Sequence, residues 1–299
     1  MKSLNRLASI LLALFVTVLW SSSFVIIKIG LDEIPPLLFA GLRYIIAAMC
    51  FLPLLLTKDR RKQITNLSSI EWKLIIAYGI VFIAVTQGIM FLALSLLPSV
   101  TVSLILNFTP VLVAFMGIIL IKEYPTTRQW IGTTLFIVGI LIYFLPSETI
   151  EGKFLGVIVM VAGVFANAGA TVLGRRINRS KSISPIIVTA LSMIIGSIIL
   201  LIIGLALHGI PTISYTNLML LFWMAIVNTA FAFTLWNKTM QSLSAMEISI
   251  INGTMLIQIA ILAWLFLGEE ITLLEGVGML VAAAGALLVQ LKRKSKGDS

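Results

Sequence analysis

The chain has 299 residues, of which 60% are hydrophobic and only 11% are charged, and its mean hydropathy is +1.11. A soluble domain is about half apolar and a quarter charged, so these values exclude a soluble globular protein and predict a chain solvated largely by lipid. With one cysteine (Cys50) and one histidine (His208), the sequence offers no zinc or haem constellation, and we expect no metal and no cofactor.

The hydrophobic runs predict an all-α integral membrane protein with ten transmembrane helices, since about 20 apolar residues in a helix cross a bilayer. The first run follows Lys2 and Arg6 but is longer than the ~7–15-residue core of a signal peptide, so we expect it to be retained. In chain order the expected spans are 8–30, 36–56, 73–93, 98–121, 129–146, 154–174, 184–207, 217–236, 244–267 and 272–291.

The basic residues predict how these spans are oriented. If the N-terminus is cytoplasmic, the internal segments hold 18 of the 21 Lys and Arg residues, as the positive-inside rule requires. We therefore expect a multi-pass protein of the cell (inner) membrane with both termini in the cytoplasm. The same bias explains the net charge of +9, so the expected partner of these residues is the lipid bilayer and not nucleic acid.

The second half of the sequence repeats the first with a displacement of 146 residues. The matched pairs are Ser103 with Ser249, Glu123 with Glu269, Thr126 with Thr272, Gly132 with Gly278 and Gly139 with Gly285. A displacement of nearly half the chain indicates a duplication, so we expect two repeats, 1–148 and 149–299. Five helices are an odd number, so the second repeat is inverted in the membrane. The basic loop Lys122–Arg128 accordingly matches an acidic loop, Glu269–Glu275.

Several segments resemble a known family. The sequence Ala263–Thr272 (AWLFLGEEIT), followed by two glycines, resembles the repeat signature of the drug/metabolite transporter superfamily, EamA branch. Trp20–Phe24 (WSSSF), followed by Lys28, Pro36 and Arg43, resembles the opening of that family's first repeat, and Asn107–Pro110 (NFTP) resembles its fourth helix. The resemblance covers nearly the whole chain. It implies a ten-helix inverted-repeat carrier of small solutes, with a central cavity lined by helices 1, 3, 4, 6, 8 and 9.

Polar and aromatic side chains within those six helices are the candidates for lining the cavity. Polar groups are costly in lipid, so each faces either a cavity or a neighbouring helix. Helical spacing places Ser103 with Asn107, and Asn167 with Thr171, on shared faces. The candidate residues are Trp20, Ser23, Gln87, Ser103, Asn107, Asn167, Thr171, Asn228, Trp236, Ser249 and Asn252.

Pro110 predicts a bend in the fourth span, because proline removes a backbone hydrogen bond and clashes with the carbonyl of Leu106. That freed carbonyl, beside Asn107, would suit a contact with a substrate or an ion; a kink without a ligand is the alternative. The second repeat has Leu256 in place of this proline and Ser192 in place of Arg43, so the two copies have specialised.

Two charged residues within the spans have two interpretations each. Arg43 either reaches the outer interface and pairs with Asp32 or Glu33, or faces the cavity and attracts an anionic group. Glu247 either binds and releases a proton during transport, or complements the dipole of the helix that begins near Ser244.

These features predict a secondary transporter that moves a small organic solute by alternating access. The resemblance favours export of amino acids, related metabolites or drug-like compounds. The sequence has no G-x-x-x-x-G-K-[ST] motif, so the energy comes from an ion gradient, proton coupling being one candidate, or from the solute's own gradient. A lipid or lipid-precursor flippase is the alternative. A membrane-embedded enzyme would need clustered titratable groups, which are nearly absent from the spans. A non-transporting sensor would normally carry a sizeable cytoplasmic output domain, whereas the longest internal loop expected here is 57–72. The sequence leaves the oligomeric state open.

Overall fold

All regular elements in the computed structural model are helices, and the structure describes residues 5–97, 99–122, 124–144, 154–267 and 272–290. In the first half they are α1 (Arg6–Gly30), α2 (Pro36–Leu55), α3 (Lys58–Thr65), α4 (Ser69–Tyr78), η1 (Gly79–Gln87), α5 (Gly88–Leu96), α6 (Ser99–Leu106), α7 (Thr109–Ile121) and α8 (Thr127–Phe144). In the second half they are α9 (Phe154–Arg179), α10 (Pro185–His208), α11 (Tyr215–Ala225), η2 (Ile226–Phe231), α12 (Ala232–Thr239), α13 (Ala245–Gly253), α14 (Met255–Leu267) and α15 (Leu273–Gln290).

The helices confirm a multi-pass membrane protein. Among the described residues, 7 helical stretches are long and apolar enough to cross a membrane. Three shorter apolar helices, Thr109–Leu120, Thr127–Ile142 and Gly276–Gly285, accompany them. Large apolar side chains such as Leu7, Ile119 and Leu280 are exposed on the outside of the bundle, where lipid replaces water. The number of ten spans stays a prediction.

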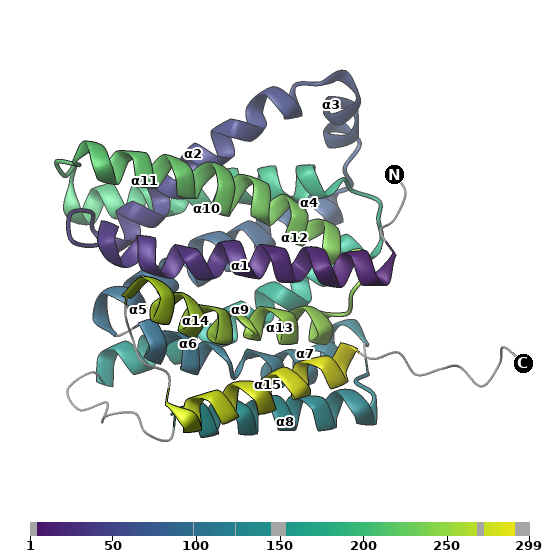
Figure 1. The fold of residues 1–299 in the computed structure, drawn as a ribbon. Coiled ribbons are helices and arrows are strands. Elements are labelled where there is room, and N and C mark those ends of the chain that lie inside the picture. Colours follow the sequence, from purple (N-terminus) through teal and green to yellow (C-terminus); the bar gives the residue numbers. More distant parts are fainter. Residues whose placement is uncertain (1–4, 98, 123, 145–153, 268–271, 291–299) are drawn as a thin grey trace, which may run out of the picture.

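The two halves contain corresponding elements in the same order. Each has two long helices, then a helix interrupted by a π-helical segment (η1 or η2), then a helix broken near its middle, then a final helix; the short helix α3 is an addition in the first half. Figure 1 shows that α15 ends at the end of the bundle where α1 begins. The expected boundary at 148/149 and the loop residues Glu123, Glu269 and Glu270 lie outside the described residues.

The expected internal loop 57–72 is partly helical. The segment 57–72 contains α3 and the first residues of α4, and a capping box begins α4: Ser68 Oγ accepts from the Glu71 backbone N–H, and the Glu71 carboxylate accepts from the Ser68 N–H. The S-x-x-E pattern is a sequence signal for this helix start, but the expected span was placed by hydrophobicity alone and so began later, after these polar residues.

Glycines bring the two halves into close contact at two places. In the pair α8 and α15, a Cβ on Gly132 would lie 2.8 Å from the Gly285 carbonyl oxygen, and one on Gly139 would lie 2.6 Å from that of Gly278. In the pair α2 and α10, a Cβ on Gly204 would lie 2.7 Å from the Leu38 backbone nitrogen. Figure 1 shows α8 with α15 and α2 with α10 on opposite sides of the bundle, with α1 and α9 between them.

We expect Gly139→Ala to lower the free energy of unfolding of the detergent-solubilised protein by about 1–3 kcal/mol. The added methyl group would clash with the backbone of α15, which can shift only if the whole helix moves. Gly276→Ala on α15 is the matched control, since a Cβ there has no neighbour within 4 Å. Equal unfolding temperatures for the two variants would contradict the close contact.

Candidate functional site

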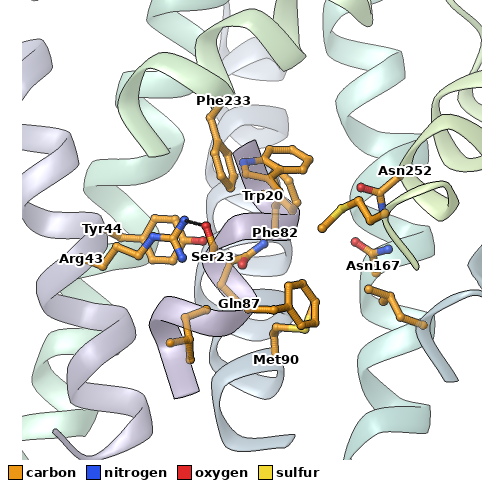
Figure 2. A pocket seen from close by; sticks show the side chains of 14 residues that line it. Trp20, Ser23, Arg43, Tyr44, Phe82, Gln87, Met90, Asn167, Phe233 and Asn252 are labelled. Carbon is orange, nitrogen blue, oxygen red and sulfur yellow. Dashed lines mark hydrogen bonds between the residues drawn. The ribbon is translucent and has the colours of Figure 1, made fainter. Parts of the chain in front are cut away.

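A narrow cavity lies in the middle of the bundle, between the two halves. Its volume is about 60 Å³. Figure 2 shows Arg43 and Tyr44 on one side of it, Asn167 and Asn252 on the other, and Trp20 with Phe233 between them. The lining residues come from α1 (Trp20, Ser23, Phe24, Ile27), α2 (Arg43, Tyr44), η1 and α5 (Phe82, Gln87, Met90), α6 (Leu106), α9 (Asn167), α12 (Phe233), α13 (Asn252) and α14 (Met255).

Arg43 is the charged residue of this cavity, and it is 3% exposed. Its Nε donates to Thr229 Oγ1 at 2.7 Å, and its Nη2 donates to Ser23 Oγ at 3.4 Å and to the Asn228 carbonyl oxygen at 3.3 Å. The guanidinium also lies 5.5 Å from the centre of the Tyr44 ring. In the described part of the chain, no carboxylate forms an ion pair with Arg43.

The structure therefore supports the cavity-facing interpretation of Arg43. The alternative required a pair with Asp32 or Glu33 at the outer interface. Glu33 instead accepts a hydrogen bond from the Ser214 backbone N–H at 2.9 Å, and hydrogen bonds from Asn217 and Ser214 hold the pKa of Glu33 below its usual value.

The π-helical segment η2 supplies the groups that hold Arg43. The Asn228 carbonyl oxygen accepts from Trp20 Nε1 at 3.0 Å as well as from Arg43. Thr229 Oγ1 donates to the carbonyl of Met224, five residues earlier, just as Thr86 Oγ1 in η1 donates to Val81. A π turn is wider than an α turn, which re-aims carbonyls, and such turns are frequent at functional sites. The sequence carried no periodic signal for either segment.

Asn228 was expected to line the cavity, and the structure places it beside the cavity as a clamp on α1. Its Nδ2 donates to the Leu19 carbonyl oxygen at 2.8 Å, to Ser22 Oγ at 3.1 Å and to Ser23 Oγ at 2.7 Å. These bonds fix Ser23, which does line the cavity.

The other predicted residues divide among three neighbouring pockets. Trp20, Ser23, Gln87, Asn167 and Asn252 line the central cavity with Arg43. Thr171 and Trp236 line a smaller pocket that shares Trp20, Asn167 and Asn252 with it. Ser103, Asn107 and Ser249 line a third pocket, of about 10 Å³. The structure therefore brings these ten residues together, and their role in binding a solute stays a prediction.

The third pocket lies where the two broken helices meet. The first break falls at Asn107 and Phe108, just before Pro110, which confirms the predicted bend. The second falls at Thr254, although Leu256 replaces the proline there. The Asn107 Oδ1 and Ser249 Oγ atoms are buried in this region without a hydrogen-bond partner, so they are available to a ligand or to water.

One detail of the predicted bend is wrong. The carbonyl of Leu106 is not free, because Thr109 Oγ1 donates to it at 2.5 Å. In the second half Thr254 Oγ1 likewise donates to the carbonyl of Ile251 at 2.6 Å. A threonine hydroxyl therefore satisfies a carbonyl at each break, whether or not a proline follows.

Aromatic side chains cover much of the central cavity, and most of them were not among the predicted residues. The ring centre of Trp20 lies 4.9 Å from that of Phe233 and 4.8 Å from that of Trp236. The Phe233 ring also lies 5.2 Å from that of Phe82 and 5.8 Å from that of Tyr44. Isolated Phe and Tyr residues in an apolar span carry no sequence signal that distinguishes a cavity from lipid.

Glu247 lies at the start of α13, away from the cavity. It forms a capping box with Ser244 and an ion pair with Arg6 at the start of α1. This geometry agrees with the dipole interpretation of Glu247. Its side chain is nevertheless almost completely buried.

A polar network near the same end of the bundle escaped the sequence analysis. Asn178 Nδ2 donates to Asn237 Oδ1 at 3.0 Å, and Asn237 Nδ2 donates to Thr189 Oγ1 at 2.9 Å. The network joins α9, α12 and α10. It was missed because the expected spans ended at 174 and 236, short of both asparagines.

A lipid-embedded helical bundle with two corresponding halves and a polar, aromatic cavity between them is the architecture of a membrane transporter. The comparison with family models specifies which kind. The EamA-like transporter family matches residues 7–145 and again residues 154–291, and the chain belongs to this family. It is therefore a transporter and not an enzyme, which confirms both the resemblance and the predicted class.

Individual relatives cover nearly the whole chain. A "Probable amino-acid metabolite efflux pump" of Escherichia coli (strain K12) is 27% identical over 92% of this chain and 92% of its own length. An "S-adenosylmethionine/S-adenosylhomocysteine transporter" of Chlamydia trachomatis serovar L2 is 26% identical over 88% of this chain and 84% of its own. A solved crystal structure with 14% identity has a TM-score of 0.77 over 95% of this chain and 96% of that one, which shows a shared fold.

We expect Thr229→Val to destabilise the protein by about 1–3 kcal/mol, because valine keeps the shape of threonine but leaves Arg43 Nε without its acceptor. Thr229→Ser is the control, since it retains the hydroxyl group. Thermal unfolding of the purified variants measures the difference, and a valine variant as stable as the serine variant would show that Thr229 does not hold Arg43.

Proposed function

We propose that this protein is a secondary transporter that exports a small organic solute, an amino acid, a related metabolite or a drug-like compound, by alternating access. The observation that carries the proposal is the cavity between the two halves, lined by amides, aromatic rings and the buried Arg43. The amides and the guanidinium are costly to bury in a membrane, so their presence together in one cavity indicates a polar ligand.

The relatives support both the substrate class and the direction. One is named for the efflux of amino-acid metabolites and another for the transport of two adenosyl amino acids. Both kinds of solute are small, polar and organic. Export is proposed on the first of these names.

Alternating access is proposed from the small volume of the cavity. Its volume of about 60 Å³ is well below the ~300–1,000 Å³ of pockets that hold a small molecule, so the helices must part for a solute to enter. Contacts between helices at the two ends of α1 would open in turn. At one end Arg6 pairs with Glu247, and at the other Lys28 Nζ donates to the Leu94 and Leu97 carbonyls at 2.7 and 2.9 Å. In this proposal ten spans form two inverted repeats, and both termini are cytoplasmic.

For energy coupling we propose Glu247 as the proton-binding group. It is the one buried carboxylate among the described residues. Its ion pair with Arg6 joins α1 to α13, two helices that line the cavity further along their length. Separation of this pair would expose the carboxylate to water and to protons when the cytoplasmic side opens.

We expect Asn107→Ala and Asn228→Ala to reduce solute flux by about tenfold or more while the protein still inserts in the membrane. The first removes the unpartnered Oδ1 of Asn107 at the broken helices, and the second removes the clamp that orients Ser23. Asn66→Ala, at an exposed position after α3, is the control. Flux is measured in liposomes with a solute identified by profiling the medium of overexpressing and deleted cells. Wild-type flux in both variants would overturn the site assignment.

Glu247→Gln is expected to abolish the pH dependence of flux, because glutamine can still accept the cap hydrogen bond but cannot bind a proton. Glu71→Gln is a matched control, since Glu71 occupies the same position in the capping box of α4. Flux is measured in vesicles over a range of external pH. Unchanged pH dependence in the Glu247 variant would exclude proton coupling through this residue.

A further inference from the structure

The positive charge of Arg43 has no negative partner in the described part of the chain. A buried charge with only neutral partners is costly, by several kcal/mol in general. Of the residues that line the central cavity, none is Asp or Glu. The buried carboxylate of Glu247 is paired with Arg6 and does not line the cavity. The empty cavity therefore carries a net positive charge.

The hydrogen bonds of Arg43 leave part of its guanidinium available to a solute. Nε is held at 2.7 Å by Thr229, whereas Nη2 makes only two long bonds, at 3.3 and 3.4 Å. Nη1 makes no hydrogen bond in the structure, although Arg43 faces the cavity. A guanidinium offers its two Nη groups side by side, and this geometry matches the two oxygens of a carboxylate.

The remainder of the cavity favours an apolar body on the solute. The rings of Trp20, Phe82 and Phe233 lie next to one another, with Met90 and Met255 also in the lining. On the side opposite Arg43, Asn167 and Asn252 offer neutral amides, which bind neutral polar groups but cannot neutralise an ammonium group (Figure 2).

We propose that the cavity selects organic monoanions: solutes with one carboxylate on an apolar or aromatic body and without a compensating positive charge. This inference rests on the proposed transport function and, within its broad class of small organic solutes, favours carboxylates without an amino group over free amino acids. Arg43 binds the carboxylate, and the aromatic rings cover the body. A zwitterion binds more weakly, because its ammonium group is desolvated without an acidic partner. A cation is repelled by Arg43.

The test uses three probes with the same phenylethyl body: 3-phenylpropionate (an anion), phenylalanine (a zwitterion) and 2-phenylethylamine (a cation). Binding to the purified wild-type protein is measured by isothermal titration calorimetry at neutral pH. The anion is expected to bind about tenfold more tightly than the zwitterion, which corresponds to ~1.4 kcal/mol, and the cation is expected to bind most weakly.

Two variants assign the preference to its source. Arg43→Gln is expected to weaken binding of the anion about tenfold and to remove most of its advantage over the amine, whereas Arg43→Lys, which keeps the charge, retains that advantage. The order of the three probes in the wild-type protein tests the proposal even if the Gln variant does not fold. The proposal is overturned if the wild-type protein binds phenylalanine or the amine as tightly as the anion, if it does not bind the anion at millimolar concentration, or if Arg43→Gln binds the anion as tightly as the wild-type protein does.

A parallel measurement of flux in liposomes separates this inference from the proposed function. Solutes that are transported without regard to their charge would overturn the charge selectivity and leave the transporter in place. An anion that binds in the expected order but is never carried across the membrane would overturn the transport proposal and support the binding site.

Discussion

The guanidinium of Arg43 is held in the centre of a lipid-embedded bundle by groups that belong to the other half of the chain. Because a bilayer offers no water to a buried polar group, each such group needs a partner within the protein. Thr229 and the carbonyl of Asn228 supply those partners, and the π-helical turn of η2 directs them toward α2. The same carbonyl also holds Trp20. The charge, the wide turn and the aromatic wall of the cavity are therefore parts of one arrangement.

The all-helical, multi-pass character followed from the apolar runs of about 20 residues, because a helix of that length crosses the bilayer and satisfies its own backbone hydrogen bonds. The 146-residue repeat predicted a site between the halves, and the structure places Asn167 and Asn252 in the central cavity and Ser103 and Asn107 in the pocket beside it. Each of these is a polar residue in an apolar span, which is a strong local signal.

What the sequence did not reveal depends on contacts between helices. Phe82, Phe233 and Tyr44 look like any other apolar residues until the neighbouring helices place them around one space. The π-helical segments η1 and η2 are local changes in backbone hydrogen bonding within longer helices, and amino-acid helix propensities do not predict where such changes occur. The second helix break, at Thr254, has no proline to announce it. Thr254 corresponds to Thr109 in its contacts and not in a sequence motif, because each hydroxyl donates to the carbonyl three residues earlier.

The distance along the chain between Arg43 and its partners bears on how this protein can be made and how it could have evolved. Thr229 follows Arg43 by 186 residues, so α2 enters the membrane long before the groups that shield its charge exist. If the first half were expressed alone, Ser23 would be the one hydrogen-bond partner left to Arg43 of the three seen in the full chain. The second half has Ser192 in the corresponding place, so only the first half contains this buried positive charge. The first half thus depends on the second for two of the three hydrogen-bond partners of its buried charge.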